Sequence, residues 1–441
     1  MLPSAASETR IWAPEAETLD RQSLGELQLE RLRRTVERVL AAQPRGAELL
    51  AEAGIAAAED VRSLDDLRRI PFMTKAELRA HYPLGLFTVP REEIVRIHAS
   101  SGTHGKPTVV GYTRHDLDSW TDLMARCMTT AGVRPGMVVH NANGYGLFTG
   151  GMGFHQGAER LGATVVPVSG GFTARQVVML RDLGGEVLVS TPSYALTIAA
   201  AIRQAGIDPA TLPLKLGLFG GEPWTERMRE QLDRELNFRA VNFFGLSEMC
   251  GPGVAVECVE QRHGLHVNED HFLVEVIDPE DGHVLEPGAE GELVFTTLTK
   301  EALPLIRYRT SDIGRVTTEA CPCGRTTARL LGLRGRIDDM VVIRGVNVYP
   351  SNVEHLLLGV EGIAPHYRLT VERPDVMDEL TLACEAAEET GEDARRAMAE
   401  RIVALLRERM GLRITVVVLM PGSLPRSEGK AIRLVDRRLK S

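Results

Sequence analysis

The 441-residue sequence lacks the features that mark several classes of protein. It has six cysteines, too few for a disulfide scaffold. No apolar run reaches the roughly 18 residues that a membrane span needs, and the first twenty residues hold no apolar signal-peptide core. Acidic residues outnumber basic ones by 60 to 51, which argues against sequence-independent nucleic acid binding. We therefore expect a cytoplasmic globular protein of two or three domains that contacts neither nucleic acid nor membrane.

The hydrophobic patterns predict the α/β class for most of the chain. Residues 15–60 carry apolar side chains at helical spacing. Between residues 94 and 315, short β-rich runs such as GEVLVST alternate with helical stretches such as TERMREQLDREL. This alternation indicates a large domain of sheets with helices packed on their faces. Residues 271–298 have the pattern of an antiparallel hairpin.

The pattern changes near residue 335, where a short polar segment is typical of a linker. The remainder predicts a compact α+β domain, with elements at 350–359 (helix), 366–372 (strand), 379–386 (strand), 392–411 (helix) and 413–419 (strand). We therefore divide the chain into domains at 1–337 and 338–441.

A donor-rich loop follows the apolar run IVRIHA. Its candidate phosphate-binding residues are Ser100, Ser101, Gly102, Thr103, Gly105 and Lys106. Hydroxyls, backbone N–H groups and an ammonium in one glycine-containing turn suit phosphate oxygens. The loop is not a GxxxxGK[ST] motif, because two residues separate its glycines and Pro107 follows the lysine. An ordinary turn-rich surface loop is the alternative.

An ordered series of motifs resembles the phenylacetate–CoA ligase family of the adenylate-forming enzymes. The motifs are SSGTHGKPT, NGYGLFTGG, GGEPW, FFGLSEM, LIRYRTSDIG, GRIDDMVVIRGVNVYP and LPRSEGK, and they cover nearly the whole chain. The resemblance implies a two-step ligation. ATP and an aryl acid give acyl-AMP and pyrophosphate, and the thiol of CoA then displaces AMP.

The resemblance also implies roles for residues far apart in the sequence. Lys430, on the small domain, would be the catalytic cation that bridges carboxylate and phosphate. Glu248 would bind Mg²⁺, for which a carboxylate is a suitable ligand. Asp312 would accept the ribose hydroxyls, assisted by Arg336. Asp338 matches the position of a hinge about which the small domain turns between the two steps.

Further positions match the segments that contact nucleotide and acid. The other nucleotide-binding residues would be Gly221, Glu222, Pro223, Phe243, Phe244, Gly245 and Ser247. The acid-binding residues would be Asn143, Tyr145, Phe148, Gly150 and Gly151. Phe148 would stack on an aromatic ring, for which the glycines leave room. Asn143 stands where this branch commonly has tyrosine, so its amide would either bond a ring substituent or enlarge the pocket.

Four residues form a candidate metal cluster, namely Cys258, His266, Cys321 and Cys323. Three thiolates and one imidazole suit tetrahedral Zn²⁺ in a structural role. Their spacing is unlike that of a zinc finger, so the fold would have to assemble the site. His263 is a rival fourth ligand, and reduced thiols without metal are the alternative.

Two other functions remain open. An enzyme that loads the acyl group onto a carrier-protein thiol would catalyse pyrophosphate exchange without forming a CoA ester. A nucleotide- or acyl-CoA-binding protein that has lost turnover would bind ATP without forming AMP. The sequence specifies neither the aryl acid nor the oligomeric state, for which a homodimer is one candidate.

Overall fold

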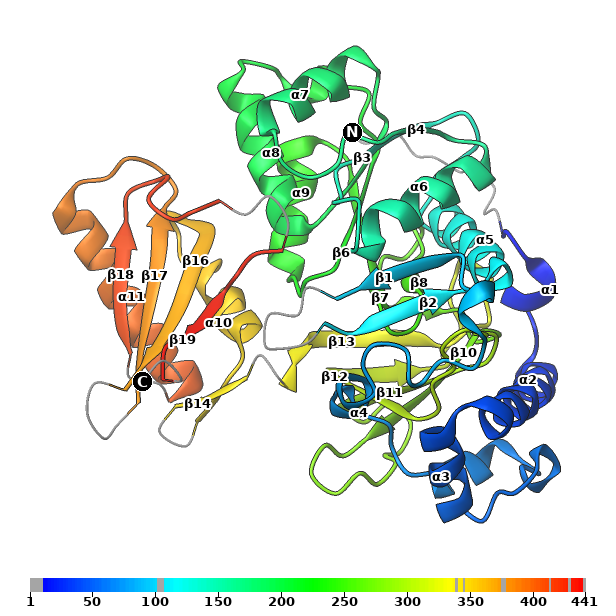
Figure 1. Cartoon of the computed structure of the whole chain (residues 1–441). Coiled ribbons are helices and arrows are strands. Elements are labelled where there is room, and N and C mark those ends of the chain that lie inside the picture. Colours follow the sequence, from blue (N-terminus) through cyan, green and yellow to red (C-terminus); the bar gives the residue numbers. More distant parts are fainter. Residues whose placement is uncertain are drawn as a thin grey trace.

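The structure is a computed structural model that describes residues 11–100, 107–337, 340–343, 346–373, 378–411, 414–426 and 430–438. Two bodies lie side by side in Figure 1, a large one coloured from blue to yellow and a small one coloured from yellow through orange to red. Ser101 to Lys106 of the candidate phosphate-binding loop (the phosphate loop below) and the expected hinge residue Asp338 lie outside the described residues.

The N-terminal segment folds as separate helices rather than one long run. They are α1 (Pro14–Glu17), α2 (Arg21–Ala42), α3 (Pro44–Glu52) and α4 (Lys75–Ala80). The Asp20 side chain caps α2 by accepting from the backbone N–H groups of Gln22 and Ser23. Pro44 occupies the first position of α3, where its missing N–H costs nothing, and it ends the α2 pattern. The expected helical character of 15–60 is therefore interrupted, with a further short 3₁₀ turn at Ala58–Asp60.

The core of the large domain is an eleven-stranded sheet. In spatial order its strands are β10 (Phe272–Ile277), β11 (Gly291–Thr297), β12 (Tyr308–Thr317), β13 (Arg329–Arg336), β9 (Leu265–Val267), β8 (Gly251–Glu257), β7 (Arg239–Leu246), β6 (Leu216–Gly220), β5 (Val187–Ser190), β3 (Val138–Asn141) and β4 (Thr164–Val166). The last five pair in parallel and the others antiparallel. The hairpin expected at 271–298 is confirmed as β10–β11.

Helices cover the parallel part of this sheet (Figure 1). They are α5 (Arg114–Thr130), α6 (Thr149–Leu161), α7 (Thr173–Asp182), α8 (Pro192–Gln204) and α9 (Glu226–Leu236). Every residue of β5 and β6 is buried, as expected for parallel strands covered on both faces. A separate antiparallel pair, β1 (Arg96–Ala99) and β2 (Val109–Tyr112), flanks the phosphate loop.

The small domain has its own core and a four-stranded sheet ordered β18-β17-β16-β19. Its elements are β14 (Val341–Ile343), β15 (Val346–Val348), α10 (Pro350–Leu357), β16 (Ile363–Glu372), β17 (Glu379–Ala386), α11 (Glu392–Met410), β18 (Thr415–Leu419) and β19 (Leu434–Asp436). The five expected elements are present within a few residues of their expected bounds. The division at 337/338 stays a prediction, although β13 ends at Arg336 and β14 begins at Val341. Among the described residues, no helix is both long enough and apolar enough to cross a bilayer.

Candidate active site

The candidate site lies where the parallel strands of the large sheet end. Asn143 follows β3, Gly221 follows β6 and Ser247 follows β7, each within two residues of the strand. The carboxyl ends of parallel strands share one edge of a sheet, and open α/β sheets bind their ligands there. The sheet thus gathers the expected acid-binding and nucleotide-binding segments at one edge.

Asp312 and Arg336 face each other on neighbouring strands. They are directly paired in the antiparallel register of β12 and β13. The backbone N–H of Asp312 donates to Thr310 Oγ1 at 3.1 Å. Burial raises the pKa of Asp312 to about 6, while the Arg336 cation opposes the rise. The carboxyl is therefore mostly ionised near neutral pH and offers two acceptor oxygens.

Glu248 lies in the tight turn that follows β7, and only 6% of it is exposed. The Tyr308 side chain, itself buried, lies beside it, and burial together with the Glu248 carboxylate raises the pKa of that phenol. A hydrogen bond fixes the turn that contains Glu248, because Tyr112 Oη donates to the Cys250 carbonyl at 3.0 Å. Glu248 is thus a carboxylate fixed among protein groups rather than one on the surface.

Lys430 of the small domain reaches this carboxylate cluster. Its Nζ lies 5.5 Å from the centre of the Phe148 ring, and its Cε lies 3.6 Å from where a Cβ on Gly221 would stand. The surrounding protein lowers the pKa of Lys430 by desolvation, although the residue is exposed. Glu222, Asp312 and Glu248 oppose this shift. Three carboxylates and two cations, Lys430 and Arg336, therefore converge from both domains.

The base of the phosphate loop is closed and borders the acid segment. Ser100 N donates to the Thr108 carbonyl, and Thr108 N donates to Ser100 Oγ, each at 2.9 Å. Ala99 N donates to the Leu147 carbonyl at 3.1 Å. The structure therefore places the ends of the loop beside residues 143–151.

The phenylalanines expected near adenine pack against other rings of the large domain. The Phe243 ring meets Phe154 edge-on at 4.7 Å, and the Phe244 ring stacks on Phe295 at 6.0 Å. Gly245 has no room for a side chain, because a Cβ there would lie 2.0 Å from the Gly251 carbonyl oxygen. The two rings are thus fixed in place, and both remain half-buried.

The acid segment uses its glycines for internal packing. A Cβ on Gly150 would lie 2.5 Å from the Phe148 ring, and one on Gly151 would lie 2.6 Å from the Gly144 carbonyl oxygen. Tyr145 Oη accepts from Asn141 Nδ2 at 2.9 Å. The space beside the two glycines is therefore filled by the Phe148 ring and the Gly144 backbone, and their role in acid binding stays a prediction.

Phe148 and Asn143 each keep a feature that a ligand could use. Phe148 is 37% exposed. Asn143 is buried, and its Nδ2 has no hydrogen-bond partner among the described atoms. A buried donor without a partner is costly, so it favours a bound group that accepts a hydrogen bond.

Sequence reasoning missed three residues that the structure adds to this region: Tyr308, Ser193 and Arg433. Tyr308 contacts Glu248, whereas Ser193 and Arg433 contact each other across the domain boundary at 3.2 Å. In the sequence, only its position three residues after Lys430 could have indicated that Arg433 lies near the site. Ser193 lies three residues after the buried strand β5. Its contact with Arg433 depends on how the two domains pack, which the sequence does not reveal.

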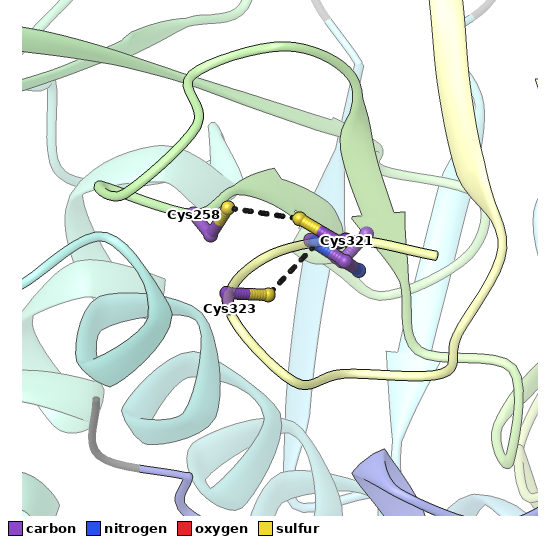
Figure 2. A group of neighbouring side chains, drawn as sticks. Cys258, Cys321 and Cys323 are labelled. Atoms are coloured by element: carbon purple, nitrogen blue, oxygen red, sulfur yellow. Dashed lines mark hydrogen bonds between the residues drawn. The ribbon is translucent and has the colours of Figure 1, made fainter. Parts of the chain in front are cut away.

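The four expected metal ligands form one buried cluster. Their Sγ and ring nitrogen atoms all lie within 4.8 Å of one another. Cys258 Sγ lies 3.6 Å from Cys321 Sγ (Figure 2), and Cys323 Sγ lies 3.4 Å from His266 Nε2. Tetrahedral zinc with ordinary bond lengths requires edges of about 3.8 Å and about 3.6 Å. His266, rather than its rival His263, supplies the imidazole of this cluster.

The electrostatics of the cluster favour a bound cation. The pKa of Cys323 is lowered by hydrogen bonds from Cys258 and His266. Burial opposes the charge on His266, but Cys321 and Cys323 raise its pKa. Its Nδ1 lies 3.0 Å from Thr327 Oγ1, which leaves Nε2 for the sulfurs and is typical of the outer contacts of a metal site.

Comparisons with known proteins place this geometry in a family. Residues 21–298 match the AMP-binding enzyme family, and residues 345–438 match the AMP-binding enzyme C-terminal domain. Together with the fold and the converging charges, these matches define an adenylate-forming enzyme. A phenylacetate–coenzyme A ligase of Thermus thermophilus is 51% identical over 96% of this chain and 99% of its own length. One of Escherichia coli is 45% identical over 96% and 97%. The chain therefore belongs to the phenylacetate–CoA ligase family.

Solved structures of 2-hydroxyisobutyryl-CoA ligase bear on the arrangement of the domains. In its postadenylation state with a bound acyl-AMP, that ligase matches 99% of this chain and 94% of its own, with a TM-score of 0.91 and 31% identity. In its thioesterification state with CoA, the TM-score is 0.72 at 30% identity, over 100% and 94%. The arrangement of the two domains therefore matches the postadenylation structure of that ligase better than its thioesterification structure.

Proposed function

We propose that this AMP-forming acid–CoA ligase acts on an aryl acid of the phenylacetate type. Two observations support this proposal. One is the full-length similarity to phenylacetate–CoA ligases. The other is the cluster of charged side chains to which the large domain contributes three carboxylates and Arg336, and the small domain Lys430. In the first step a carboxylate oxygen bonds to the α-phosphorus of ATP, and pyrophosphate leaves. In the second step the sulfur of CoA bonds to the acyl carbon, AMP leaves, and the thiol proton passes to solvent.

The charges of the site suit the first step, in which two anions must approach. Lys430 would bind the carboxylate and the α-phosphate together, and the donors of residues 100–106 would bind the β- and γ-phosphates. Glu248 fits Mg²⁺, which when bound neutralises phosphate charge. Asp312 would hold the ribose hydroxyls, with Arg336 beside it.

The adenine and the acid would occupy neighbouring spaces. Gly221, Glu222 and Pro223 would line the adenine site with their backbone, opposite the fixed rings of Phe243 and Phe244. The other members of the adenine site would be Gly245 and Ser247, with Ser247 near the α-phosphate. Phe148 and Tyr145 would contact the aryl ring, and Asn143 Nδ2 would donate a hydrogen bond to a substituent on that ring.

A panel of acids tests this function. We expect AMP release with phenylacetate and substituted aryl acids, dependent on CoA for turnover, and little with short aliphatic acids. Pyrophosphate exchange without a CoA ester would favour the carrier-protein alternative. Tight ATP binding with no AMP formation for any acid would favour the non-catalytic alternative.

The cysteine–histidine cluster would hold one structural zinc. Bound zinc would tie the end of β8 and the middle of β9 to the loop that joins β12 to β13. These last two strands carry Asp312 and Arg336. We expect metal analysis of gently purified protein to give about one zinc per chain. Replacing Cys323 by Ser should remove it and lower the melting temperature. Cys384→Ala, at a buried thiol of the small domain, should keep the zinc, and metal-free wild-type protein would contradict the assignment.

The lowered pKa of Lys430 predicts how adenylation depends on pH. A lysine whose pKa is lowered loses its proton at a lower pH, so the rate should be present below that pKa and fall above it. We expect kcat/KM for ATP, which reports groups of the free enzyme, to decline with an apparent pKa below the ordinary 10.5. Lys430→Arg should be slow but should lack this decline. If kcat/KM of Lys430→Arg fell at the same pH as in the wild type, the pKa would belong to another group.

The oligomeric state and location stay predictions. We propose a homodimer in the cytoplasm, and light scattering of the purified protein and fractionation of cells measure the two directly.

A further inference from the structure

The segment that carries Lys430 is fastened to the large domain by one carboxylate. Glu222 Oε1 accepts from the backbone N–H of Ser193 at 2.8 Å, and Glu222 Oε2 accepts from that of Ala431 at 2.7 Å. Ser193 belongs to α8 of the large domain, whereas Ala431 directly follows Lys430. A single side chain thus joins the two domains next to the catalytic lysine.

Arg433 makes a second contact at the same place. Its Nη2 donates to Ser193 Oγ at 3.2 Å. Within the small domain the guanidinium lies 3.5 Å from the buried carboxylate of Glu354 and 4.4 Å from the centre of the Tyr367 ring. Arg433 is therefore oriented before the domains meet, which reduces the entropy lost when the contact forms.

An open cavity adjoins these contacts. It has a volume of about 440 Å³ and is lined by Ser193 and Thr197 of α8 and by Arg368, Arg426 and Arg433 of the small domain. Leu358 of the small domain packs against an apolar cluster of the large domain. Beside Lys430, the domains meet through a few charge-assisted hydrogen bonds. Such bonds are stronger than neutral ones, yet water can replace them when the domains separate.

We propose that Glu222 and Arg433 form a latch that holds the small domain in its adenylation orientation and opens for the thiol step. They are positioning residues that act through the backbone beside Lys430. The inference rests on the proposed two-step function and gives Glu222 a role beyond contact with nucleotide. It agrees with the better match to the postadenylation state, 0.91 against 0.72 in TM-score.

Glu222→Gln tests the latch, because the amide keeps the shape but turns an N–H toward one of the two N–H donors. We expect kcat for acid-dependent pyrophosphate exchange to fall about 10- to 100-fold, the size of a lost charge-assisted bond. The rate of thiolysis of supplied acyl-AMP by CoA, and its KM for acyl-AMP, should stay within about twofold of wild type. An equal rise in the KM for acyl-AMP would make Glu222 a nucleotide ligand and overturn the latch, as would unchanged exchange.

Arg433→Met provides a second variant in case the first does not fold. In this variant too, pyrophosphate exchange should fall while thiolysis of supplied acyl-AMP stays close to the wild-type rate. Because the two residues share Ser193, the double variant should lose less than the two single losses combined. Arg437→Met is the matched control, since Arg437 is exposed and pairs with Glu372 inside the small domain, and it should leave both steps unchanged. Failure of the proposed function would appear in the wild type, as no exchange with any aryl acid, whereas failure of the latch appears only in the variants.

Discussion

Replacing Lys430 by Ala is expected to abolish adenylation while sparing thiolysis. The lysine is the cation that reaches Glu248, Asp312 and Glu222 from the small domain. In the proposed function it acts where the carboxylate meets the α-phosphate. Loss of one donor aimed at a transition state typically costs about 100- to 1,000-fold in rate. We therefore expect acid-dependent pyrophosphate exchange to fall by at least about 100-fold. In the second step the small domain would have turned away, so CoA should still consume supplied acyl-AMP at close to the wild-type rate.

The control for this experiment is Lys215→Ala, which removes an exposed lysine paired only with Glu186 on the surface of the large domain. It should leave both steps unchanged. Equal loss of exchange and thiolysis in Lys430→Ala would remove the role assigned to this lysine.

Replacing Asp312 by Asn is expected to damage both steps, in contrast to Lys430→Ala. Asp312 sits on β12 of the large domain, which does not depend on the orientation of the small one, and its carboxylate would hold the ribose of ATP and of acyl-AMP alike. A hydrogen bond to a charged group contributes about 1.5–3 kcal/mol, or roughly 10- to 100-fold. We expect the KM for ATP in exchange and the KM for acyl-AMP in thiolysis to rise by that factor.

Asp281→Asn is the matched control, because this aspartate is exposed on the β10–β11 connection and bonds only its neighbour His283. It should change neither KM. A variant of Asp312 with a raised KM for ATP alone would show that the carboxylate does not serve the acyl-AMP complex.

The sequence predicted elements best where local pattern and packing agree. The strands β16 and β17 and the helix α11 were anticipated within about three residues, because alternation and helical spacing mark their buried faces. The three-residue strand β19 was missed, since it is too short to show a period. The helical run at 15–60 was too long, because the stop at Pro44 was not taken into account.

In the candidate site, the sequence identified individual residues but not the contacts between them. Asp312 and Arg336 were both named, but their direct pairing follows from the register of β12 and β13, which no local pattern reveals. The metal cluster was anticipated from residue type alone, and the fold supplied its geometry. The contacts of Glu222 with Ser193 and Ala431 could not be anticipated, because they join segments about 30 and 210 residues apart through the meeting of two domains.

A crystal structure with bound ATP and Mg²⁺, or with a stable acyl-AMP analogue, tests the central claim most directly. We expect the α-phosphate to lie within hydrogen-bond distance of Lys430 Nζ. The β- and γ-phosphates of ATP should contact residues 100–106, and the ribose hydroxyls should donate to the Asp312 carboxylate. Phosphates bound far from that loop, or a Lys430 that contacts neither phosphate nor carboxylate in this domain orientation, would contradict it.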